Sequence, residues 1–598
     1  MNPNAEYSAV NDAVRGQFFR RTWAMITPYW RSEEKGKAWL LLAVVIGLSL
    51  FSVAISVWLN HWYKDFYNAL ENKDTAAFWQ QIGYFCGIAT VAILGAVYRL
   101  YLTQMLTIRW RAWLTEKYFA RWLGHKNYYQ LEQGGYTDNP DQRISEDLNS
   151  FTSNTLSLGL GLLRNVVSLV SFSIILWGVS GSIDVFGITI PGYMFWCALV
   201  YAAVGSWLTH LIGRRLIGLS NQQQRFEADL RFSMVRVREN AESIALYNGE
   251  PNENQRLSAR FGKVWHNYWD IMKVSKRLTF FTAGYEQIAT VFAFIVAAPR
   301  YFSGKIELGE LMQINSAFGN VQGNFSWFIS AYSDLAGWRA TSDRLLSFQQ
   351  AMRDNEQRPA AIDVSAEGER LVVQGMGMDL VDGRHLLTDA HMIVEPGQRV
   401  MLSGRSGSGK STLLRAMGHL WPAGHGSIRL PAKRYLFLPQ KPYLPIGTLK
   451  AVLSYPQDDS VYPAERYAQV LETCRLPHLV GRLEEANHWQ RMLSPGEQQR
   501  LAFARALLFA PQWLYMDEAT SAMDEEDEAT LYQALIDELP GLSIVSVGHR
   551  SSLKRFHGRH VRIEGGRLQE QQWAQGQTRS MRGRACSRIG SISYRCAD

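Results

Sequence analysis

The stretch RVMLSGRSGSGKSTLLRAM, residues 399–417, runs from an apolar segment through clustered glycines into a segment typical of a helix. Gly404, Gly409, Lys410 and Ser411 satisfy G-x-x-x-x-G-K-[ST], the pattern of a phosphate-binding loop. Glycines let backbone N–H groups curl around phosphate oxygens, and the helix N-terminus adds positive potential. We expect Lys410 to reach the β and γ phosphates of a nucleotide and the Ser411 hydroxyl to ligate Mg²⁺. A glycine-rich turn without a function would rarely combine these residues with an apolar segment before it and a helix after it.

A second apolar segment, WLYMDEATSAMD at 513–524, ends in two carboxylates. We expect Asp517 to hold Mg²⁺ through water and Glu518 to polarise an attacking water molecule. Gln440 and His549 also follow apolar segments. Gln440 is a candidate for contact with Mg²⁺ and the attacking water, and His549 for contact with the γ-phosphate. Each alone would be read as an ordinary polar residue at a strand end, but their order along the chain favours a shared site.

The segment LSPGEQQRLAFARAL, residues 493–507, predicts a helix with a defined start. Ser494 suits the N-cap, Pro495 the first helical position, and Glu497 completes a capping box. A well-capped helix explains all three residues without any function. Gly496 favours more, because a small residue at an exposed helix start leaves room for an anion.

The N-terminal half contains long apolar stretches, and residues 38–59 carry no charge over a length that can cross a hydrocarbon core of roughly 30 Å. We predict six membrane-spanning helices, at residues 38–59, 82–103, 156–180, 190–212, 278–302 and 308–331. Lys and Arg concentrate before the first span and in the loops at 104–155 and 213–277. This pattern predicts that both termini are cytoplasmic. The two basic loops are poor in glycine and proline, so we expect the helices to continue beyond the membrane.

Composition excludes several other classes of protein. The 598 residues are 47% hydrophobic and 19% charged, which is unlike a disordered chain, and the five cysteines form no CxxC pair. The net charge of +8 would suggest nucleic acid as a partner, but it resides in the basic loops and the C-terminal tail. We therefore expect no nucleic-acid partner. The tail, residues 571–598, lacks an apolar period and is expected to be disordered and basic.

These motifs, in this order, resemble the nucleotide-binding domain of an ATP-binding cassette (ABC) transporter. The resemblance assigns Gln440 to the Q-loop, Leu493–Glu497 to the signature, Asp517 and Glu518 to Walker B and the catalytic carboxylate, and His549 to the switch histidine. It implies that ATP and Mg²⁺ are the cofactors and that the chain works as a dimer, with a second copy of itself or with a different half-transporter. In such a dimer Ser494 and Gly496 of one copy close over ATP bound to Walker A of the other. The residues that the resemblance assigns to nucleotide binding in Walker A are Gly404, Ser406, Gly407, Gly409, Lys410, Ser411 and Thr412.

The membrane half carries further resemblance. YYQLEQGGYTDNPDQRISEDL, residues 128–148, and RVRENAESIALYNGE, residues 236–250, are similar to subfamily D and the SbmA/BacA-like group, and the whole chain to the bacterial YddA-like branch. The resemblance implies an all-α six-helix transmembrane domain of the ABC exporter type, followed by an α/β P-loop NTPase domain, in the bacterial inner membrane. The expected domains are a cytoplasmic segment 1–37, the membrane domain 38–345, a linker 346–368 and the nucleotide-binding domain 369–570. Asn139-Pro140-Asp141 is either a plain turn or a coupling segment.

Two features depart from the family pattern. Pro495 and Glu497 stand where the commonest signature is LSGGQ. The aromatic residue that stacks on adenine is absent from GMGMDLVDGRH, residues 375–385, so either Met378 or Leu380 packs on the base or an aromatic residue comes from elsewhere. Base selectivity is therefore open, and GTP is expected to compete.

The cargo must be argued from polar residues within the spans. In the sixth span Ser316, Asn320 and Asn324 share one helical stripe, while Arg164 and Glu286 interrupt the third and fifth spans. They predict either a hydrated cavity or hydrogen bonds between helices. A cavity favours ATP-driven movement of a hydrophilic or amphipathic solute, such as a peptide or a cobalamin-like compound. The alternatives are an exporter or flippase of acyl or lipid cargo, as subfamily D implies, and an ATP-binding membrane sensor without transport.

Overall fold

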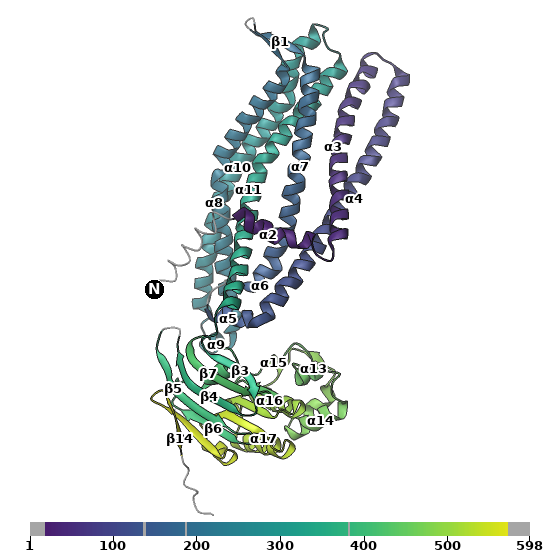
Figure 1. Ribbon diagram of the computed structural model, residues 1–598. Coiled ribbons are helices and arrows are strands. Elements are labelled where there is room, and N and C mark those ends of the chain that lie inside the picture. The colour runs from purple at the N-terminus through teal and green to yellow at the C-terminus, as the bar shows by residue number, and fades with distance from the viewer. Residues whose placement is uncertain (1–17, 135–138, 186–187, 381–382, 572–598) are drawn as a thin grey trace, which may run out of the picture. The chain divides into compact units, whose positions relative to one another are not determined.

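The computed structural model describes residues 18–134, 139–185, 188–380 and 383–571. The chain divides into two units, Met1–Glu356 and Gln357–Asp598. The first consists mainly of long helices, and the second of sheets with helices around them (Figure 1). This confirms the predicted order of an all-α domain followed by an α/β domain. The predicted tail, apart from Gln571, lies outside the described residues.

Six long helices, α3, α4, α7, α8, α10 and α11, form most of the first unit (Figure 1). Helices α3 and α4 pack along each other, as do α8 and α10. In chain order the elements are α2 (Phe18–Trp30), α3 (Lys35–Glu71), α4 (Thr75–Leu123), η1 (Gly124–Lys126), α5 (Asn127–Gly134), α6 (Pro140–Gln142), η2 (Arg143–Asp147), α7 (Leu148–Ser180), β1 (Ser182–Val185), β2 (Ile188–Pro191), α8 (Tyr193–Glu239), α9 (Ala241–Leu246), α10 (Glu250–Phe302) and α11 (Leu308–Gln357).

Most of these helices are apolar enough to cross a membrane. Among the described residues, five helical stretches meet this requirement by length and composition, and they hold the first five predicted spans: Lys35–Glu71, Thr75–Gly134, Pro140–Ser180, Tyr193–Glu239 and Glu250–Phe302. The sixth predicted span begins α11, whose polar residues lower its hydropathy. Its apolar side chains Ile314, Ala317, Phe318 and Val321 are fully buried. They pack in one core with side chains of α7, α8 and α10, so α11 belongs to the bundle.

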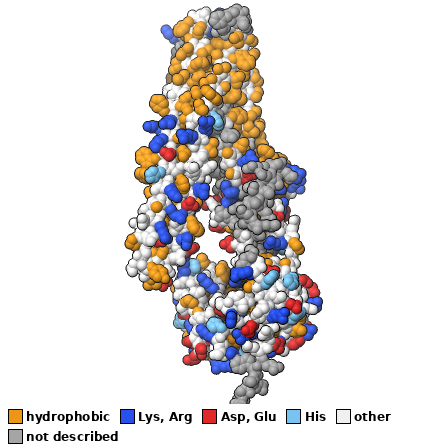
Figure 2. Space-filling view, turned by 90° about the vertical axis from the view of Figure 1, so that its left-hand side faces the viewer, with side chains coloured by type: hydrophobic (Ala, Val, Ile, Leu, Met, Phe, Trp, Pro, Cys, Tyr) orange, Lys and Arg blue, Asp and Glu red, His pale blue; other side chains and the backbone are white. Residues whose placement is uncertain are grey.

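The apolar surface of the helical unit has the character of a membrane-facing band. Figure 2 shows hydrophobic side chains covering one end of the long helices and Lys and Arg gathering toward the other end. On α8 and α10 the exposed apolar residues include Trp196, Val200, Trp207, Ile288 and Ile295. As predicted, both helices continue well past their spans, into the segment that carries the basic residues.

Two predicted boundaries are wrong. The fourth span does not begin at residue 190, because Ile188–Pro191 form strand β2 and α8 begins at Tyr193. Pro191 lacks an N–H group and Gly192 has a φ of +62°, so neither continues a helix backward. The predicted linker, 346–368, is instead the last part of α11 to Gln357, a short connection, and strand β3 from Asp363. Leu346, Phe348 and Met352 are buried, which explains why the helix persists.

The second unit contains two main sheets. The strands are β3 (Asp363–Gly368), β4 (Leu371–Asp379), β5 (His385–Val394), β6 (Arg399–Gly404), β7 (Gly424–Pro431), β8 (Tyr435–Leu438), β9 (Gly447–Thr448), β10 (Ala486–Asn487), β11 (Trp513–Asp517), β12 (Ser543–Val547), β13 (Arg559–Glu564) and β14 (Arg567–Gln571). The larger sheet has the order β14-β13-β6-β12-β11-β8, and only β14 runs antiparallel to its neighbour. The smaller sheet has the order β3-β7-β4-β5; its mainly antiparallel pairing was not predicted.

Helices cover the larger sheet and join its strands. They are α12 (Lys410–Met417), α13 (Leu449–Ser454), α14 (Ala464–Thr473), η3 (Pro477–Arg482), α15 (Trp489–Met492), α16 (Pro495–Phe509), α17 (Glu525–Glu538) and η4 (Ser551–Phe556). Strands β11 and β12 are buried almost throughout, as apolar parallel strands are. Because β6, β8, β11 and β12 run in the same direction, their carboxyl ends meet at one edge of the sheet. The residues that follow those ends build the site.

Candidate nucleotide site and membrane cavity

The phosphate-binding loop joins β6 to α12, as predicted. Gly404 has a φ of +150°, and a Cβ there would lie 2.8 Å from Ser408 Oγ and 2.9 Å from Ile563 O. Gly409 has a φ of +98° and forms the N-cap of α12. These two positions therefore require glycine. Between them, Ser406 and Gly407 are exposed at the turn, where backbone N–H groups are accessible to phosphate oxygens.

The Lys410 side chain curls over this loop. Its ammonium group donates to Gly404 O at 3.1 Å and to Arg405 O at 3.0 Å. The residue is 8% exposed, so its charge is held close to the loop that would receive the phosphates. Thr412 lies in the first turn of α12, half-buried beside Ser411. The Walker A residues thus form one continuous strand–loop–helix site.

Two of the predicted Mg²⁺ ligands are in contact. Ser411 Oγ donates to Asp517 Oδ1 at 2.7 Å, which brings the start of α12 to the end of β11. A hydroxyl and a carboxylate oxygen are the hard donors that Mg²⁺ accepts. The side-chain oxygen of Gln440 adds a third donor of the same type, two residues past the end of β8. The donor set therefore fits a magnesium ion.

Glu518 is turned out of the strand that precedes it. Its backbone has a φ of +48°, which is unusual for a residue with a side chain, and its N–H donates to Val547 O at 3.1 Å. Its carboxylate accepts from Gln440 Nε2 at 3.2 Å. Asp517 at the end of β11 pairs with Val547 at the end of β12. His549 lies two residues after Val547, and its side chain is exposed. The predicted base, the Q-loop glutamine and the switch histidine therefore lie at one sheet edge.

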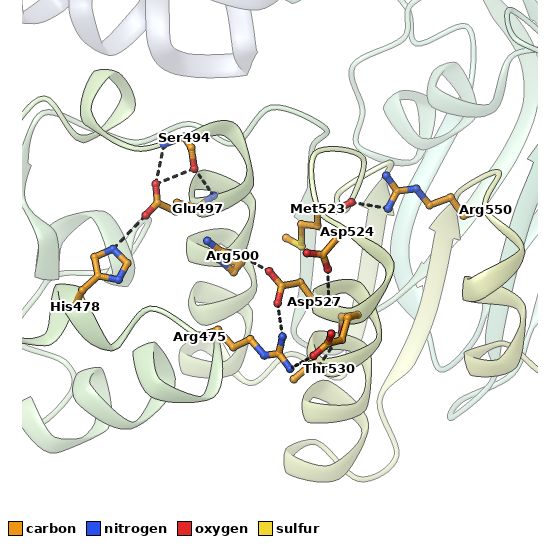
Figure 3. Close-up of polar contacts among 11 residues, drawn as sticks. Arg475, His478, Ser494, Glu497, Arg500, Met523, Asp524, Asp527, Thr530 and Arg550 are labelled. Atoms are coloured by element: carbon orange, nitrogen blue, oxygen red, sulfur yellow. Dashed lines mark hydrogen bonds and ion pairs between the residues drawn. The ribbon is translucent and has the colours of Figure 1, made fainter.

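The signature segment caps α16 as the sequence predicted. Ser494 Oγ accepts from the Glu497 N–H at 3.4 Å, and the Ser494 N–H and Oγ both donate to Glu497 Oε2, at 2.9 and 2.8 Å (Figure 3). His478 Nε2 lies 3.1 Å from Glu497 Oε1. Burial, the largest single influence, raises the pKa of Glu497, but the hydrogen bonds from Ser494 and the nearby His478 and Arg500 outweigh it. The pKa of Glu497 therefore lies below its usual range, and α16 begins with a fixed negative charge.

Gly496 allows a close contact with the loop after β11. A Cβ at this position would lie 3.1 Å from Ala522 O. Among the hydrogen bonds of the described residues, none joins Ser494 or Gly496 to a Walker A residue of the same chain. Within the described part of the chain, the signature and Walker A are therefore not joined directly by a hydrogen bond.

Sequence reasoning missed Gln499, a buried residue that links three motifs. Its Nε2 donates to Gln440 O at 3.0 Å and to Ser521 Oγ at 3.2 Å, and its Oε1 accepts from the Ala522 N–H at 2.9 Å. The residue is 4% exposed. A glutamine on the buried face of α16, among apolar residues, is the signal that would have identified it. It holds the Q-loop and the loop 519–524 to the signature helix.

Arginine side chains bind the 519–524 loop and the start of the helix that follows it. Arg550 donates to Met523 O at 2.7 Å and to Ser521 O at 3.1 Å. Asp527, near the start of α17, accepts from Arg475 at 2.6 Å and from Arg500 at 2.5 Å (Figure 3). These contacts tie α16 and α17 together beside the signature, and the sequence pattern did not reveal them.

Met378 is not free to stack on a base, so one of the two predicted adenine contacts is wrong. The side chain is fully buried in the core between the sheets. Its Cε would lie 3.7 Å from a Cβ at Gly409, so the methionine supports the loop from below. Leu380 is half-buried, and its N–H donates to Arg384 O at 2.8 Å within the hairpin after β4. Leu380 and an aromatic residue from elsewhere remain as the candidates.

The helical unit contains an open cavity of about 600 Å³ between α3, α4 and α7, with Trp327 of α11 at its wall. Arg164 lines it, as predicted, and so does Arg99, which sequence reasoning did not select. The other lining residues are mostly Ser, Thr, Asn and Gln, with a few apolar side chains. An open cavity with a mixed polar and apolar lining is therefore present in the helical unit.

The remaining predicted cavity residues lie elsewhere. Asn324 is buried and its Nδ2 donates to Ser168 Oγ at 2.8 Å, so it joins α11 to α7. Asn320 Nδ2 donates to Ser316 O of its own helix at 2.9 Å. Glu286 is exposed on α10, and no ion pair of the described residues joins it to Arg164. The stripe at 316, 320 and 324 thus serves packing and local hydrogen bonds. These three residues and Glu286 lie outside the cavity lining.

Comparison with known proteins agrees with both units. Residues 24–302 match the family described as "ABC transporter transmembrane region 2", and residues 387–521 match the family "ABC transporter". The chain is 35% identical to the "Inner membrane ABC transporter ATP-binding protein YddA" of Escherichia coli, over 88% of this chain and 94% of that protein. It is 27% identical to the human "Lysosomal cobalamin transporter ABCD4", over 92% of this chain and 95% of that protein.

The fold is also that of a solved structure. A bacterial Atm1-family ABC exporter with ATP bound superposes with a TM-score of 0.70, at 17% identity, over 88% of this chain and 94% of that chain. The similarity supports the exporter-type arrangement of a helical membrane domain and an ATP-binding domain. From its motifs, its fold and its relatives, the chain belongs to the ABC transporter family, as a half-size transporter related to subfamily D and to YddA whose ATPase activity is coupled to transport.

Proposed function

We propose that two copies of this chain form a homodimer in the bacterial inner membrane that moves a hydrophilic or amphipathic solute across it by alternating access. The observation that carries this proposal is the cavity between α3, α4 and α7, whose mixed lining includes two arginines and several neutral polar side chains. Ser49, Thr103 and Ser157 of its lining fall within the predicted spans, where polar side chains are costly unless they meet water, a solute or one another. A cavity of about 600 Å³ has the size of sites that hold small organic ligands.

Hydrolysis is assigned to the residues at the sheet edge. Glu518 acts as the general base toward water, and its hydrogen bond to Gln440 orients the carboxylate. Lys410 and the loop N–H groups bind the phosphates, and His549 contacts the γ-phosphate. Ser411, Asp517 and Gln440 would hold Mg²⁺, which neutralises phosphate charge during transfer. The close contact of Ser411 with Asp517 supports this assignment.

A dimer completes the nucleotide site. Among the hydrogen bonds of the described residues, none holds Ser494 or Gly496 to Walker A of their own chain. A nucleotide bound by a second copy would reach them by displacing or sharing the Glu497 carboxylate. ATP held between two copies would draw their nucleotide-binding units together and change the access of the cavity. The distribution of Lys and Arg supports cytoplasmic termini, and the inner-membrane relative YddA supports the location.

The cargo classes are a peptide or a cobalamin-like compound, the second supported by the name of the human relative. A specific observation also favours an acyl or lipid cargo, namely the apolar residues Leu100, Ile108 and Leu160 in the same cavity. The two readings differ in what should stimulate ATP turnover: peptides or cobalamin for the first, acyl-CoA or lipid for the second.

Reconstituted proteoliposomes test the proposal. Their lumen holds short peptides and cobalamin, the ATPase units face outward, and lumenal contents are followed by mass spectrometry after Mg-ATP is added. Loss of a component with the native chain but not with Glu518→Gln would support transport toward the cytoplasmic side. Turnover of ATP without loss would direct the test to acyl-CoA and export. Failure to move any of these solutes in either direction would leave the membrane sensor as the better reading.

A further inference from the structure

We infer that the cavity between α3, α4 and α7 is an anion site, in which Arg99 and Arg164 bind a carboxylate or phosphate group of the transported solute. The inference rests on the proposed transport function and adds the chemical class of the cargo. Its basis is the placement of two guanidinium groups, from two different helices, in one cavity of the membrane unit.

The two arginines converge from neighbouring helices. Arg99 belongs to α4 and Arg164 to α7, and both are half-buried at the cavity wall. Arg99 Nη1 donates to Ser52 Oγ of α3 at 3.3 Å, which fixes one side of its guanidinium and leaves other N–H groups for a ligand. The predicted spans place Arg99 about 6 Å and Arg164 about 12 Å inside the membrane from the cytoplasmic side, at 1.5 Å per residue.

Within the described residues, no carboxylate balances these two charges. The cavity lining contains no Asp or Glu, and neither arginine takes part in an ion pair. Other arginines of the same unit do have acidic partners. Arg121 binds Glu356 at 2.5 Å, and Arg344 binds Asp147 at 2.6 Å. The cavity therefore carries two positive charges that the protein itself does not neutralise.

Such a pair is costly in a membrane unless something compensates it. An uncompensated charge among membrane helices is unfavourable, and intramembrane ionisable residues usually mark a substrate path. The planar fork of a guanidinium matches a carboxylate or phosphate through two parallel hydrogen bonds. An anionic group between the two arginines would supply both the charge and the acceptors.

The rest of the lining suits an organic anion rather than a bare inorganic ion. Neutral hydrogen-bonding side chains from α4 and α7 surround the arginines, among them Gln104, Asn149 and Asn154. Trp327 closes one wall, where Gly161 lets the ring approach: a Cβ at 161 would lie only 2.8 Å from the ring. The cavity thus offers two charges, neutral polar contacts and an aromatic surface to one ligand.

Fluorescence binding to the full-length chain in phosphatidylcholine nanodiscs tests the inference without ATP. The probes are N-dansyl-glutamate and its neutral isostere, N-dansyl-glutaminamide. We expect the anionic probe to bind about tenfold to hundredfold more tightly than the neutral one, as charge-assisted hydrogen bonds imply. Arg99→Gln and Arg164→Gln should each remove most of this preference, and Arg164→Lys should restore part of it. Arg256→Gln, which removes an exposed charge paired with Glu253, is the matched control and should change nothing.

Equal affinity of the native chain for the two probes would overturn the inference, whatever the variants do. So would an unchanged preference in both Gln variants. Displacement of the bound probe by phosphatidylglycerol would identify a lipid headgroup as the source of the anionic group, and lack of displacement a soluble solute. A charge preference in binding combined with no ATP-driven movement of any solute would refute the proposed transport and leave the anion site standing. ATP-driven movement of solutes regardless of their charge would refute the anion site and leave the proposed transport standing.

Discussion

The most informative variant is Gln499→Leu, because one side chain holds three motifs of the ATPase together. Leucine has a similar size but no polar atoms, so the fold of α16 should survive. The substitution removes the two bonds to Gln440 O and Ser521 Oγ and the one from the Ala522 N–H, all at 3.2 Å or less. The Q-loop and the 519–524 loop then lose their common support.

The magnitude follows from the burial of these partners. A hydrogen bond contributes about 1 kcal/mol net, and a buried partner left unpaired costs about 1–3 kcal/mol. For the Ala522 N–H, a loss of about 1.4 kcal/mol in opening free energy corresponds to roughly tenfold faster amide exchange. We expect a fall of about tenfold in kcat with little change in KM for ATP, because the loops that surround the hydrolytic residues are loosened while the Walker A cradle remains.

Hydrogen–deuterium exchange of peptides covering residues 519–524, in the full chain, measures the first effect, and steady-state ATP turnover the second. Gln533→Leu is the matched control, since Gln533 is exposed on α17 and its Nε2 bonds only Asp537 of its own helix, at 2.8 Å. If exchange of the 519–524 loop is the same in Gln499→Leu and in the native chain, the reasoning from these three bonds is refuted.

Three further predictions concern the same unit. Glu518→Gln should lower ATP turnover by about 10²–10⁴-fold while ATP binding persists, measured by phosphate release and nucleotide binding; unchanged turnover would remove Glu518 from the role of base. Leu380→Tyr should strengthen ATP binding by about 1–3 kcal/mol, because an aromatic ring can stack on the base, and an unchanged KM for ATP would place Leu380 away from the base. Burial lowers the pKa of His557 from its ordinary 6.5 to about 4. The folded chain therefore keeps His557 neutral, whereas the unfolded chain protonates it below about pH 6.5. The free energy of unfolding is unaffected by this residue above pH 6.5 and falls by about 3 kcal/mol as the pH drops toward 4. Thermal unfolding between these pH values should show a steeper decline for the native chain than for His557→Gln, and equal slopes would contradict the shift.

The nucleotide site was largely predictable because its chemistry restricts the backbone. Gly404 and Gly409 need conformations that other residues avoid, and the roles proposed for Lys410 and Asp517 require positions at the start of α12 and the end of β11. Such constraints act locally and leave a fixed spacing in the chain. Gln499 and Arg550 escaped prediction because they bind mainly backbone atoms of distant loops. Backbone acceptors have no residue type to recognise.

The membrane unit was predictable in outline and less so in detail. Apolar length gave the spans, since any crossing helix must meet the thickness of the hydrocarbon core. From its spacing, the polar stripe of Ser316, Asn320 and Asn324 predicted either a cavity or hydrogen bonds between helices. Spacing places residues on one face of a helix but does not tell which neighbour that face meets. In the structure the Asn324 amide meets Ser168, while the cavity lies by Arg99 and Arg164.

The contact of Glu497 with Ser494 has a consequence for how fast such a dimer could open. The helix that should receive a phosphate already holds a carboxylate, bound to both the N–H and the hydroxyl of Ser494. An arriving nucleotide must displace that internal anion or share its donors, against the repulsion of two negative groups. A glutamine would offer the same cap without the charge. In the proposed dimer, the native residue would therefore oppose prolonged trapping of ATP and favour an interface that reopens readily.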